Sequence, residues 1–341
     1  MSNGDAPVDS LVAGRYYLKS RWGRGANARV YLGWDSLLDR LVAIKVPRAH
    51  TERANRTLKR EGRLVSGLSH PGVIAMLDHG QLPDGRLYLV FEFVAGTSLD
   101  AVVRTGSINV SSVVDFGICL ATTLEYVHSC AIVHRDVKPG NVLIPGSGSA
   151  LQWQRAKLID FATARRIDDV LADGRPVATP TCIAGTPAYA APEQLLGRPL
   201  SIAADLYALG ATLFELLYGV PPFSAESFGV ATLEPDAVAH ERGYSEASSL
   251  APLPLMLVGP LIVAKLSKEV VPPEGDIPDD LRDLVRLLLR IEPKERPTSA
   301  RAVIEALRRI AAKLGSTTSG QPPTHVAREP VSLDEIETRD E

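Results

Sequence analysis

The pattern of apolar and polar residues divides the chain into two parts of different character. Residues 15–94 contain short β-like runs and one helical pattern: YYLKS, RVYLGW, LVAIKV, LYLVFEFV and the helical TLKREGRLVSGL. From about residue 108 onward, apolar residues recur at the spacing of a helix face, as in DLYALGATLFELLYG and SARAVIEALRRIAAKL. This order predicts an α+β fold of two lobes, the first β-rich with one key helix and the second mainly helical, with a cleft between them.

The same pattern suggests four segments. We expect a flexible arm over residues 1–13, the first lobe over 14–94, the second lobe over 95–315 and a disordered acidic tail over 316–341. The tail is rich in Ser, Thr, Pro and acidic residues, so it buries too little apolar surface to offset the entropy of folding. No internal repeat is visible.

Charge and cysteine content exclude several classes of function. The 37 Lys and Arg residues against 40 Asp and Glu residues give a net charge of −3, whereas a generic nucleic-acid binder carries a basic excess. The three cysteines form no CxxC pattern, which argues against a zinc site or a disulfide framework and indicates a reducing compartment. We therefore expect no nucleic-acid partner.

The apolar stretches give no sign of membrane insertion. The start of the chain, MSNGDAPVDS, is polar and acidic, unlike a signal or transit peptide. The longest apolar stretch, residues 250–264, contains prolines and is shorter than the roughly 20 residues that span a bilayer. We interpret it as a core or groove helix and expect a soluble protein with no membrane span.

A glycine-containing loop lies between the first two β-like runs. Gly23, Gly25 and Ala28, followed by Val30, resemble a G-x-G-x-x-G loop with alanine in place of the third glycine. Such a loop lets backbone N–H groups approach phosphates closely. By itself the pattern is more typical of an ordinary hairpin, and its two flanking strands argue against a Rossmann crossover, which needs a strand and a helix.

Two charged residues interrupt apolar patterns in the first lobe. Lys45 lies within the strand-like LVAIKV, and Glu61 lies in the apolar stripe of the helical pattern over 57–68. Because an unpaired buried charge is costly, we predict that Lys45 and Glu61 pair across the strand–helix interface. A purely structural salt bridge, or a snorkelling lysine and a glutamate at the solvent edge, would give the same pattern.

A dense polar loop follows in the second part, between two apolar runs, where proteins often present catalytic groups. Within IVHRDVKPGNVLI (132–144), Asp136 can accept a proton from a hydroxyl group and Lys138 can neutralise phosphate charge. Asn141 offers a carbonyl oxygen to a hard cation, and Asp160, at the end of another apolar run, supplies a carboxylate. This combination is improbable for a merely structural turn.

Taken in order, these motifs resemble eukaryotic-type (Hanks-type) serine/threonine protein kinases, and the bacterial branch in particular. The resemblance covers roughly residues 14–314. Its motifs occur in the family's order: a glycine-rich loop ending at Val30, VAIK at 42–45, Glu61, HRD at 134–136, Asp-Phe-x at 160–162, Ala-Pro-Glu at 191–193, Asp205 and Arg296. Lys138, together with Gly-Thr-Pro at 185–187, resembles the serine/threonine class rather than the tyrosine class.

The resemblance implies a role for each polar residue in phosphoryl transfer from ATP to a protein hydroxyl group. Lys45 would hold the α- and β-phosphates, with Glu61 orienting it. Asp160 and Asn141 would ligate Mg²⁺, or Mn²⁺ in its place. Asp136 would orient and deprotonate the substrate hydroxyl group, and Lys138 would stabilise the γ-phosphoryl group.

The resemblance also implies where adenine would bind and what would brace the second lobe. Phe91 would be the gatekeeper, Glu92 and Val94 would offer hinge backbone to adenine, and Ala43 and Leu143 would sandwich the ring. Gly23, Gly25 and Val30 would line the ATP site from the glycine-rich loop. Asp205 would be structural, and Glu193 and Arg296 would form a structural ion pair.

Regulation by phosphorylation is a further expectation from the resemblance. Arg135 precedes Asp136, so a phosphate on the activation segment, which also contains Thr186, could order it through charge-assisted hydrogen bonds. We hypothesise autophosphorylation in trans at Thr179 or Thr181, which would require self-association. The expected partners are proteins with Ser or Thr acceptors, and the expected location is the bacterial cytoplasm.

Three features depart from the family pattern. Ala28 replaces the third loop glycine, and residues 226–254 are longer than expected, as a plain surface loop or an inserted docking surface. Ala162 replaces the glycine of the Asp-Phe-Gly triplet. At a positive φ, alanine would cost about 1–2 kcal/mol; at a negative φ it would stabilise by about 0.4–1 kcal/mol. In both cases we expect altered mobility of the segment rather than an inactive enzyme.

Two other functions fit parts of the sequence. A pseudokinase would bind nucleotide as a scaffold without efficient transfer, but every catalytic position is filled here. A kinase for a small molecule could share Asp136 and Asn141, but it would not be expected to contain GTPAYAAPE (185–193), whose family role is to position a protein hydroxyl group.

Overall fold

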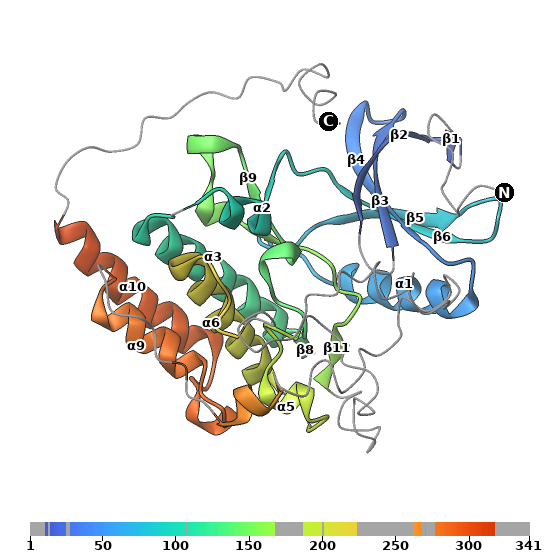
Figure 1. Ribbon diagram of the computed structural model, residues 1–341. Helices are drawn as coiled ribbons and strands as arrows, with labels where there is room; N and C mark the ends of the chain where they lie inside the picture. Colours follow the sequence, from blue (N-terminus) through green and yellow to red (C-terminus); the bar gives the residue numbers. More distant parts are fainter. Residues whose placement is uncertain are drawn as a thin grey trace, which may run out of the picture.

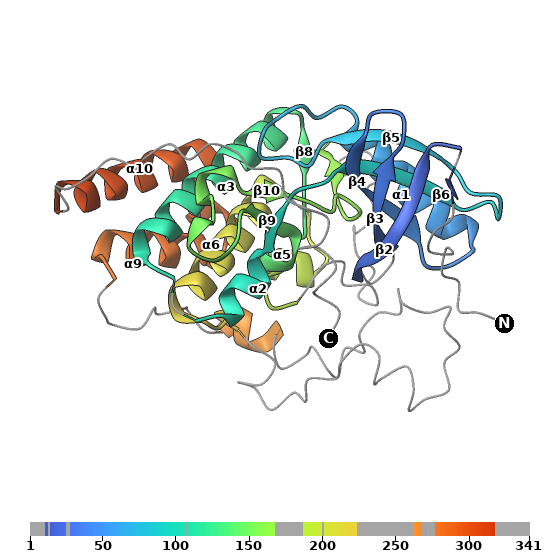
Figure 2. The same cartoon turned by 90° about the horizontal axis from the view of Figure 1, so that it is seen from above.

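The computed structural model separates the chain into a sheet-containing lobe and a helical lobe, which lie at opposite ends of the molecule (Figures 1 and 2). The two-lobed α+β prediction is therefore confirmed. The structure describes residues 11–12, 14–24, 28–106, 108–167, 187–199, 201–223, 262–267, 270 and 277–317. Several predicted features lie outside these ranges: Gly25, Thr179, Thr181, Thr186, residues 226–254, and most of the predicted arm and tail.

The first lobe is built on one antiparallel sheet with the strand order β1-β2-β3-β4-β6-β5. Its strands are β1 (Leu11–Val12), β2 (Tyr16–Arg24), β3 (Ala28–Asp35), β4 (Arg40–Pro47), β5 (Met76–Gln81) and β6 (Leu87–Glu92). Branched and aromatic residues favour these strands because they pack well on a pleated surface. The central strands β4 and β6 are buried over most of their length, so charged side chains within them require partners.

Helix α1 (Glu52–Val65) covers the sheet of the first lobe. It begins five residues before the helical pattern read from the sequence, because the Thr51 side chain caps it by accepting a hydrogen bond from the Ala54 N–H at 3.2 Å. Its buried stripe contains Leu58, Leu64 and Val65, and it also contains Glu61. Helix α1 therefore delivers one carboxylate to the interior of the lobe.

The second lobe is a helical assembly around two long apolar helices, α3 and α6. Its helices include α2 (Leu99–Arg104), α3 (Val110–Ser129), α5 (Pro192–Leu195), α6 (Ile202–Tyr218), α9 (Asp279–Leu288) and α10 (Ala300–Thr317), and residues 262–267 are also helical. Helix α6 is buried almost all round; the Ser201 side chain caps its start and Gly219, with φ of 78°, caps its end. It packs against α3 and α9, while α3 also packs against α10.

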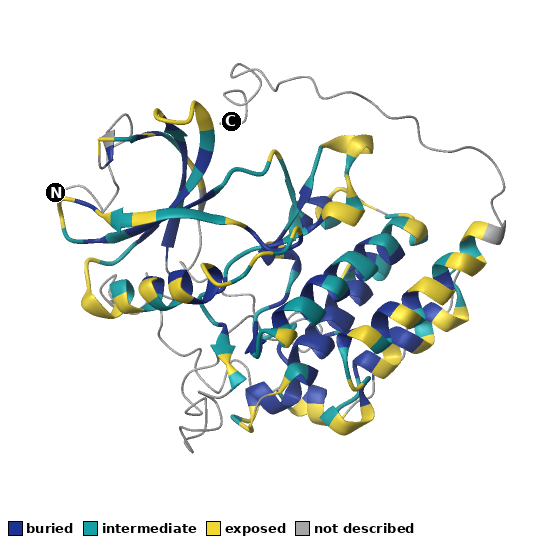
Figure 3. Ribbon diagram, turned by 180° about the vertical axis from the view of Figure 1, so that it is seen from behind, coloured by how far each residue is buried: buried dark blue, intermediate teal, exposed yellow. Residues whose placement is uncertain are grey.

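Helix α3 is long and apolar enough, by length and composition alone, to cross a membrane. Half of its apolar window is buried inside the molecule, where it packs against α6 and α10. Its inner face belongs to the continuous buried region of the second lobe (Figure 3). Its hydrophobicity is accounted for by the lobe core.

The second lobe also contains short strands around the loop that bears Asp136. They are β7 (Gly96–Ser98), β8 (Ile132–Val133), β9 (Val142–Pro145), β10 (Lys157–Leu158) and β11 (Arg165–Arg166), paired in the orders β10-β9-β7 and β11-β8. Runs of two to four residues carry too little periodic signal to be predicted from the sequence. They fix both ends of the loop that lies between β8 and β9.

Strand β10 also joins the two lobes. The Leu158 N–H donates to the Gly72 carbonyl oxygen at 2.7 Å, and the Ile74 N–H donates to the Leu158 carbonyl oxygen at 3.0 Å. One hydrophobic core continues from α1 and β6, through Phe161, into the helices of the second lobe. A smaller core around Tyr16 and Ile44 fills the rest of the first lobe.

Candidate active site

Asp136 lies in the loop between β8 and β9, and two neighbouring side chains fix its carboxylate. Asn141 donates from Nδ2 to the Asp136 carbonyl oxygen at 2.7 Å and to Oδ2 at 2.8 Å. Lys138 Nζ lies 2.9 Å from the same Oδ2. The tight turn η1 (Pro139–Asn141) brings Asn141 back toward Asp136. The structure thus brings together Asp136, Lys138 and Asn141, which the sequence had singled out.

Asp205, on α6, anchors this loop from below. Its carboxylate accepts hydrogen bonds from the His134 and Arg135 N–H groups, both at 2.8 Å, and lies 2.9 Å from His128 Nε2. Burial raises the pKa of Asp205, but His128 and the backbone N–H groups outweigh it, so the pKa lies below its usual value. These bonds hold Arg135 at φ of 73°, a strained conformation for a residue with a side chain.

His134 connects the loop to the Asp-Phe-Ala triplet. Its ring packs edge-on against Phe161 with centroids 4.7 Å apart, and its carbonyl oxygen accepts a hydrogen bond from Thr163 Oγ1 at 3.0 Å. Burial lowers the pKa of His134, so the ring is neutral at neutral pH. Because Phe161 is fully buried against His134, the triplet is packed onto the loop.

Lys45, Glu61 and Asp160 form a charged cluster contributed by three different elements. Lys45 Nζ, from β4, lies 2.6 Å and 2.9 Å from the two carboxylate oxygens of Glu61 on α1. It also lies 2.9 Å from Oδ1 of Asp160, which follows β10. The structure therefore contains the predicted strand–helix pair, together with a second carboxylate.

The cluster contains one cation and two carboxylates, and their pKa values reflect this. Burial opposes the charge of Lys45, but Asp160 and Glu61 outweigh it and raise its pKa. Burial also opposes the charge of Asp160, but Lys45 lowers its pKa to about 2. Burial raises the pKa of Glu61, against the effect of Lys45. Asp160 therefore keeps its negative charge at neutral pH, and its side chain is still 37% exposed.

The donor set fits a divalent cation that is shared with a nucleotide. Among the residues that the structure describes, no cluster of three or more His, Cys, Asp or Glu side chains could hold a metal alone. The Ile159 N–H donates to the Asn141 carbonyl oxygen at 2.9 Å, which ties Asn141 to the residue before Asp160. Because Asn141 uses Nδ2 on Asp136, its Oδ1 is the atom that can face a cation. One carboxylate and one amide oxygen, completed by phosphate oxygens and water, suit Mg²⁺.

Ala162 adopts an ordinary backbone conformation. The described non-glycine residues with positive φ are Asp39, Ala131, Arg135 and Asp160. The unusual conformation of the triplet thus lies at Asp160, with φ of 62°, where the Ala162 N–H donates to its Oδ1 at 3.2 Å. Of the positive and negative φ values considered for Ala162, the negative one applies, so alanine has no backbone penalty here.

Comparison with known proteins identifies the family. Residues 16–307 match the family model of the protein kinase domain. The chain belongs to the protein kinase family. It is 33% identical over 319 residues to the serine/threonine-protein kinase pkn2 of Myxococcus xanthus, covering 92% of this chain and 35% of that protein. The kinase PknA of Mycobacterium tuberculosis is 30% identical over 315 residues, covering 89% of this chain and 63% of its own length.

A third relative extends the comparison. The serine/threonine-protein kinase pkn3 of Myxococcus xanthus is 34% identical over 228 residues, covering 65% of this chain and 41% of that protein. The present kinase chain therefore spans less than two thirds of the length of each of these relatives.

The residues predicted to contact adenine line the junction of the kinase lobes. Ala43 on β4 pairs with Phe91 on β6. Leu143 on β9 lies opposite β7, the first strand of the second lobe. The Glu92 side chain is already engaged, since it accepts hydrogen bonds from the Ala75 N–H at 2.9 Å and from Lys157 Nζ at 2.8 Å. The Glu92 N–H in turn donates to the Ala75 carbonyl oxygen at 2.9 Å, and Val94 follows β6. Gly23 pairs with Val30 across β2 and β3.

An aromatic pair at the edge of this region was not predicted. Trp22, directly before Gly23, contacts Phe93, directly after Glu92, with ring centroids 5.3 Å apart and an interplanar angle of 74°. Trp22 remains 40% exposed. The signal was present in the sequence as two aromatic residues, each adjacent to a predicted ATP-binding residue.

Two arginines lie beside the triplet. Arg60 Nη2 on α1 donates to the Ala162 carbonyl oxygen at 2.8 Å. Burial lowers the pKa of Arg135; the charge of Asp205 opposes this and that of Arg60 adds to it. The Nε atoms of both arginines are buried, and neither has a hydrogen-bond partner within the described part of the chain.

The predicted ion pair braces the second lobe. Arg296 donates from Nη1 and Nη2 to the two carboxylate oxygens of Glu193 at 2.7 Å and 2.8 Å, and both side chains are buried. Arg296 also donates to carbonyl oxygens of Ala203, Arg290 and Ile291. The pair connects α5 to α6 and to the chain that precedes α10.

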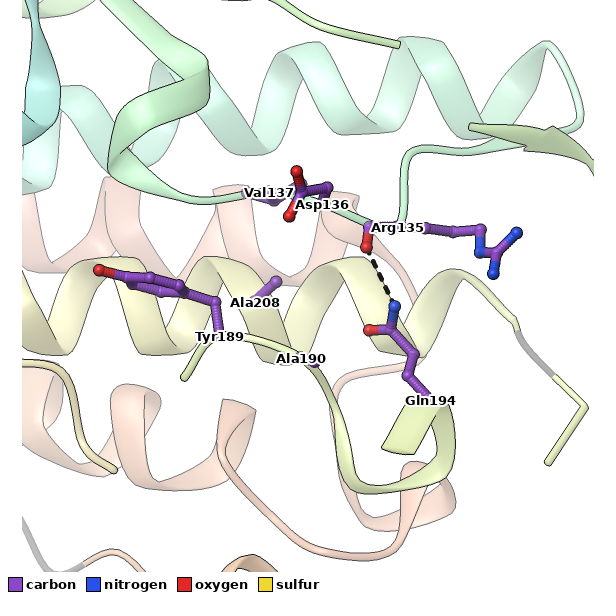
Figure 4. Close-up of a pocket in the computed structure, with 7 residues that line it drawn as sticks. All are labelled: Arg135, Asp136, Val137, Tyr189, Ala190, Gln194 and Ala208. Carbon is purple, nitrogen blue, oxygen red and sulfur yellow. Dashed lines mark hydrogen bonds between the residues drawn. The ribbon is translucent and has the colours of Figure 1, made fainter. Parts of the chain in front are cut away.

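A small hollow lies beside Asp136, between the β8–β9 loop and the segment that precedes α5 (Figure 4). It is lined by Arg135, Asp136, Val137, Tyr189, Ala190, Gln194 and Ala208. On one side Tyr189 Oη donates to Glu215 Oε2 at 2.6 Å. On the other, Gln194 Nε2 donates to the Arg135 carbonyl oxygen at 3.0 Å. The segment that bears Tyr189 and Ala190 is thus held close to Asp136.

Proposed function

We propose that this protein transfers the γ-phosphoryl group of ATP to Ser or Thr hydroxyl groups of proteins. The observation that carries this proposal is that one conformation contains both the Lys45–Glu61–Asp160 cluster and the Asp136–Lys138–Asn141 cluster. Phosphoryl transfer depends on placing positive charge and a proton acceptor around one phosphate group, which these clusters provide.

The Lys45 ammonium group would bind the α- and β-phosphates, and Glu61 would hold it in place. Asp160 and Asn141 would hold Mg²⁺, or Mn²⁺, which neutralises phosphate charge when bound. Ala43 and Leu143 would contact the faces of adenine, with Phe91 behind it and the backbone of Glu92 and Val94 at its edge. Gly23, Gly25 and Val30 would cover the nucleotide from the glycine-rich loop.

Transfer would proceed at the Asp136 carboxylate. Asn141 and Lys138 hold this carboxylate in one orientation, so that it can accept the proton of the substrate hydroxyl group. The hydroxyl oxygen then forms a bond to the γ-phosphorus as the bond to the ADP oxygen breaks. Lys138 lies close enough to Asp136 to stabilise the transferred group with its charge.

The Ser/Thr class and the bacterial setting follow the names and organisms of the relatives, and the residues 185–187 and Lys138 are consistent with that class. We propose that the protein acts in the bacterial cytoplasm, as the resemblance in the sequence implies. Phosphorylation at Thr179 or Thr181, in trans between two copies, remains part of the proposal. Arg135 and Arg60 support it, because their buried Nε atoms would suit a phosphate.

Incubation with labelled ATP and Mg²⁺, with and without a generic protein acceptor, tests the proposal. Label on Ser or Thr supports a protein kinase, and Lys45→Met and Asp136→Asn should abolish it while the protein stays folded. Nucleotide binding without transfer, with each metal in turn, would instead support the pseudokinase scaffold. Mass spectrometry of wild type and Asp136→Asn locates the phosphate; none at Thr179 or Thr181 in active protein would contradict autophosphorylation there.

A further inference from the structure

The segment that precedes α5 needs side chains to define its shape. Residues 187–191 contain a turn and a bend rather than a helix or strand, and Tyr189 and Ala190 line the hollow beside Asp136. A protein substrate would approach Asp136 on this side if the proposed function holds. Whatever fixes the backbone of this segment therefore sets the position of the acceptor hydroxyl group relative to Asp136.

Lys265 fixes two carbonyl groups of the segment. Its Nζ atom donates to the carbonyl oxygens of Ala188 and Ala190, both at 2.8 Å. Only 1% of Lys265 is exposed, and Nζ lies 5.1 Å from the ring centroid of Tyr207 and 5.5 Å from that of Phe223. One nitrogen, packed on two aromatic rings, thus binds the carbonyl groups of two residues that are separated by one residue. This double contact fixes how the backbone bends between them.

A buried lysine contributes little net stability by itself, because burial disfavours its charged form. Burial, and then the charge of Arg296, lower the pKa of Lys265 well below its usual value, although Glu193 opposes this. As an amine or as an ammonium group, the nitrogen still has two N–H donors for the two carbonyl groups. An apolar side chain of similar size would commonly stabilise a core as well or better. The two hydrogen bonds are therefore the feature that an apolar residue could not replace.

A second side chain links the segment to Asp136. Gln194 Oε1 accepts a hydrogen bond from the Ala191 N–H at 3.1 Å, and its Nε2 donates to the Arg135 carbonyl oxygen at 3.0 Å (Figure 4). Gln194 is buried. A continuous path of hydrogen bonds and short covalent segments thus runs from Lys265, through Ala190 and Ala191, to the residue before Asp136.

We propose that Lys265 is a positioning residue for the protein substrate: it holds the backbone of residues 188–190 in the form that places an acceptor Ser or Thr at Asp136. This rests on the proposed function. Lys265 contacts neither the Lys45 cluster nor the residues predicted to bind ATP in the described structure, so its effect should be confined to the protein acceptor.

Steady-state kinetics of Lys265→Met test this inference, with the same generic protein acceptor as above. Methionine is one atom shorter than lysine but keeps an unbranched apolar chain beside Tyr207 and Phe223, and it loses both donors. We expect the KM for the acceptor to rise by about tenfold, the value of one typical hydrogen bond, while the KM for ATP and the ATP hydrolysis without acceptor change by less than about twofold. Lys294→Met, an exposed lysine of the same lobe, is the matched control and should leave both KM values unchanged.

The outcomes separate the inference from the proposed function. Absence of transfer to protein by the wild type would overturn the proposed function. Transfer by the wild type with an unchanged acceptor KM in folded Lys265→Met, or an equal loss for acceptor and ATP, would overturn only the role of Lys265. If Lys265→Met does not fold, Lys265→Gln carries the same test: its amide donates but is one atom shorter, so an acceptor KM raised by about threefold is expected, and an unchanged KM contradicts the inference.

Discussion

At the scale of single residues, Lys45 is the only described cation that neutralises both Glu61 and Asp160. The pKa of Asp160, about 2, lies below its usual value of 3.8. Its contribution to stability is therefore complete above about pH 4 and is lost as the pH falls toward 2. Glu61 has a raised pKa because it is buried, and Lys45 limits that rise.

Lys45→Met should therefore destabilise the protein in a pH-dependent way. Removing one partner of a buried ion pair costs about 3–5 kcal/mol, and we expect a loss of this size at pH 7.5. At pH 5.5 the loss should be smaller, because protonation relieves carboxylates that burial has left with raised pKa values. Urea unfolding of both proteins at the two pH values measures this; an equal loss at both would contradict the assignment of the charges.

Ala162→Gly is a milder change at the neighbouring triplet. Because Ala162 has no positive φ, glycine gains nothing in the folded state and adds freedom to the unfolded chain. We expect the free energy of unfolding to fall by about 0.4–1 kcal/mol. The contacts of Ala162 to Arg60 and Asp160 are made by its backbone, so kcat should change by less than the lag of autoactivation or the inhibitor preference. A more stable glycine variant would indicate strain at this position.

At the scale of elements, the short helix α5 depends on the Glu193–Arg296 pair. Arg296→Met leaves the Glu193 carboxylate buried without its cation, so unfolding should become easier by about 3–5 kcal/mol. Chemical denaturation measures the change. Arg301→Met is the control, since Arg301 pairs with Glu305 on the exposed side of α10 and should shift stability by less than about 1 kcal/mol. Similar losses in the two variants would contradict the bracing role.

Long periodic elements and paired charges could be predicted from the sequence. The apolar periods of α6 and α10 predicted the helical lobe, and the cost of a buried charge predicted the Lys45–Glu61 pair. The two-residue strand β8 was not predicted because it contains no full period. The two-carbonyl contact of Lys265 was missed because it joins residues 75 and 77 positions apart, and only the folded backbone brings them together.

At the scale of the whole molecule, nucleotide and metal should stabilise the two lobes together. A ligand at about 100 times its Kd adds about 2.7 kcal/mol to the free energy of unfolding. We expect ATP with Mg²⁺ to raise the Tm accordingly, and a chelator or Asp160→Asn to remove the metal-dependent part. Differential scanning fluorimetry measures the Tm, and the loss of a fluorescence change on ATP binding in Trp22→Phe would assign that signal to Trp22, which adjoins the glycine-rich loop. A Tm shift in Asp160→Asn equal to that of the wild type would contradict the metal assignment.

The backbone hydrogen bonds between strand β10 and residues 72–74 attach one edge of the first lobe to the second lobe. The Glu92–Lys157 ion pair at 2.8 Å attaches the same edge, next to β5 and β6. In the strand order β1-β2-β3-β4-β6-β5, strands β1 to β3 form the opposite edge of the sheet. When the lobes open for nucleotide exchange, the first lobe should therefore pivot about its β5–β6 edge. Strands β2 and β3 should be displaced most, and Lys45, on β4, should be displaced less.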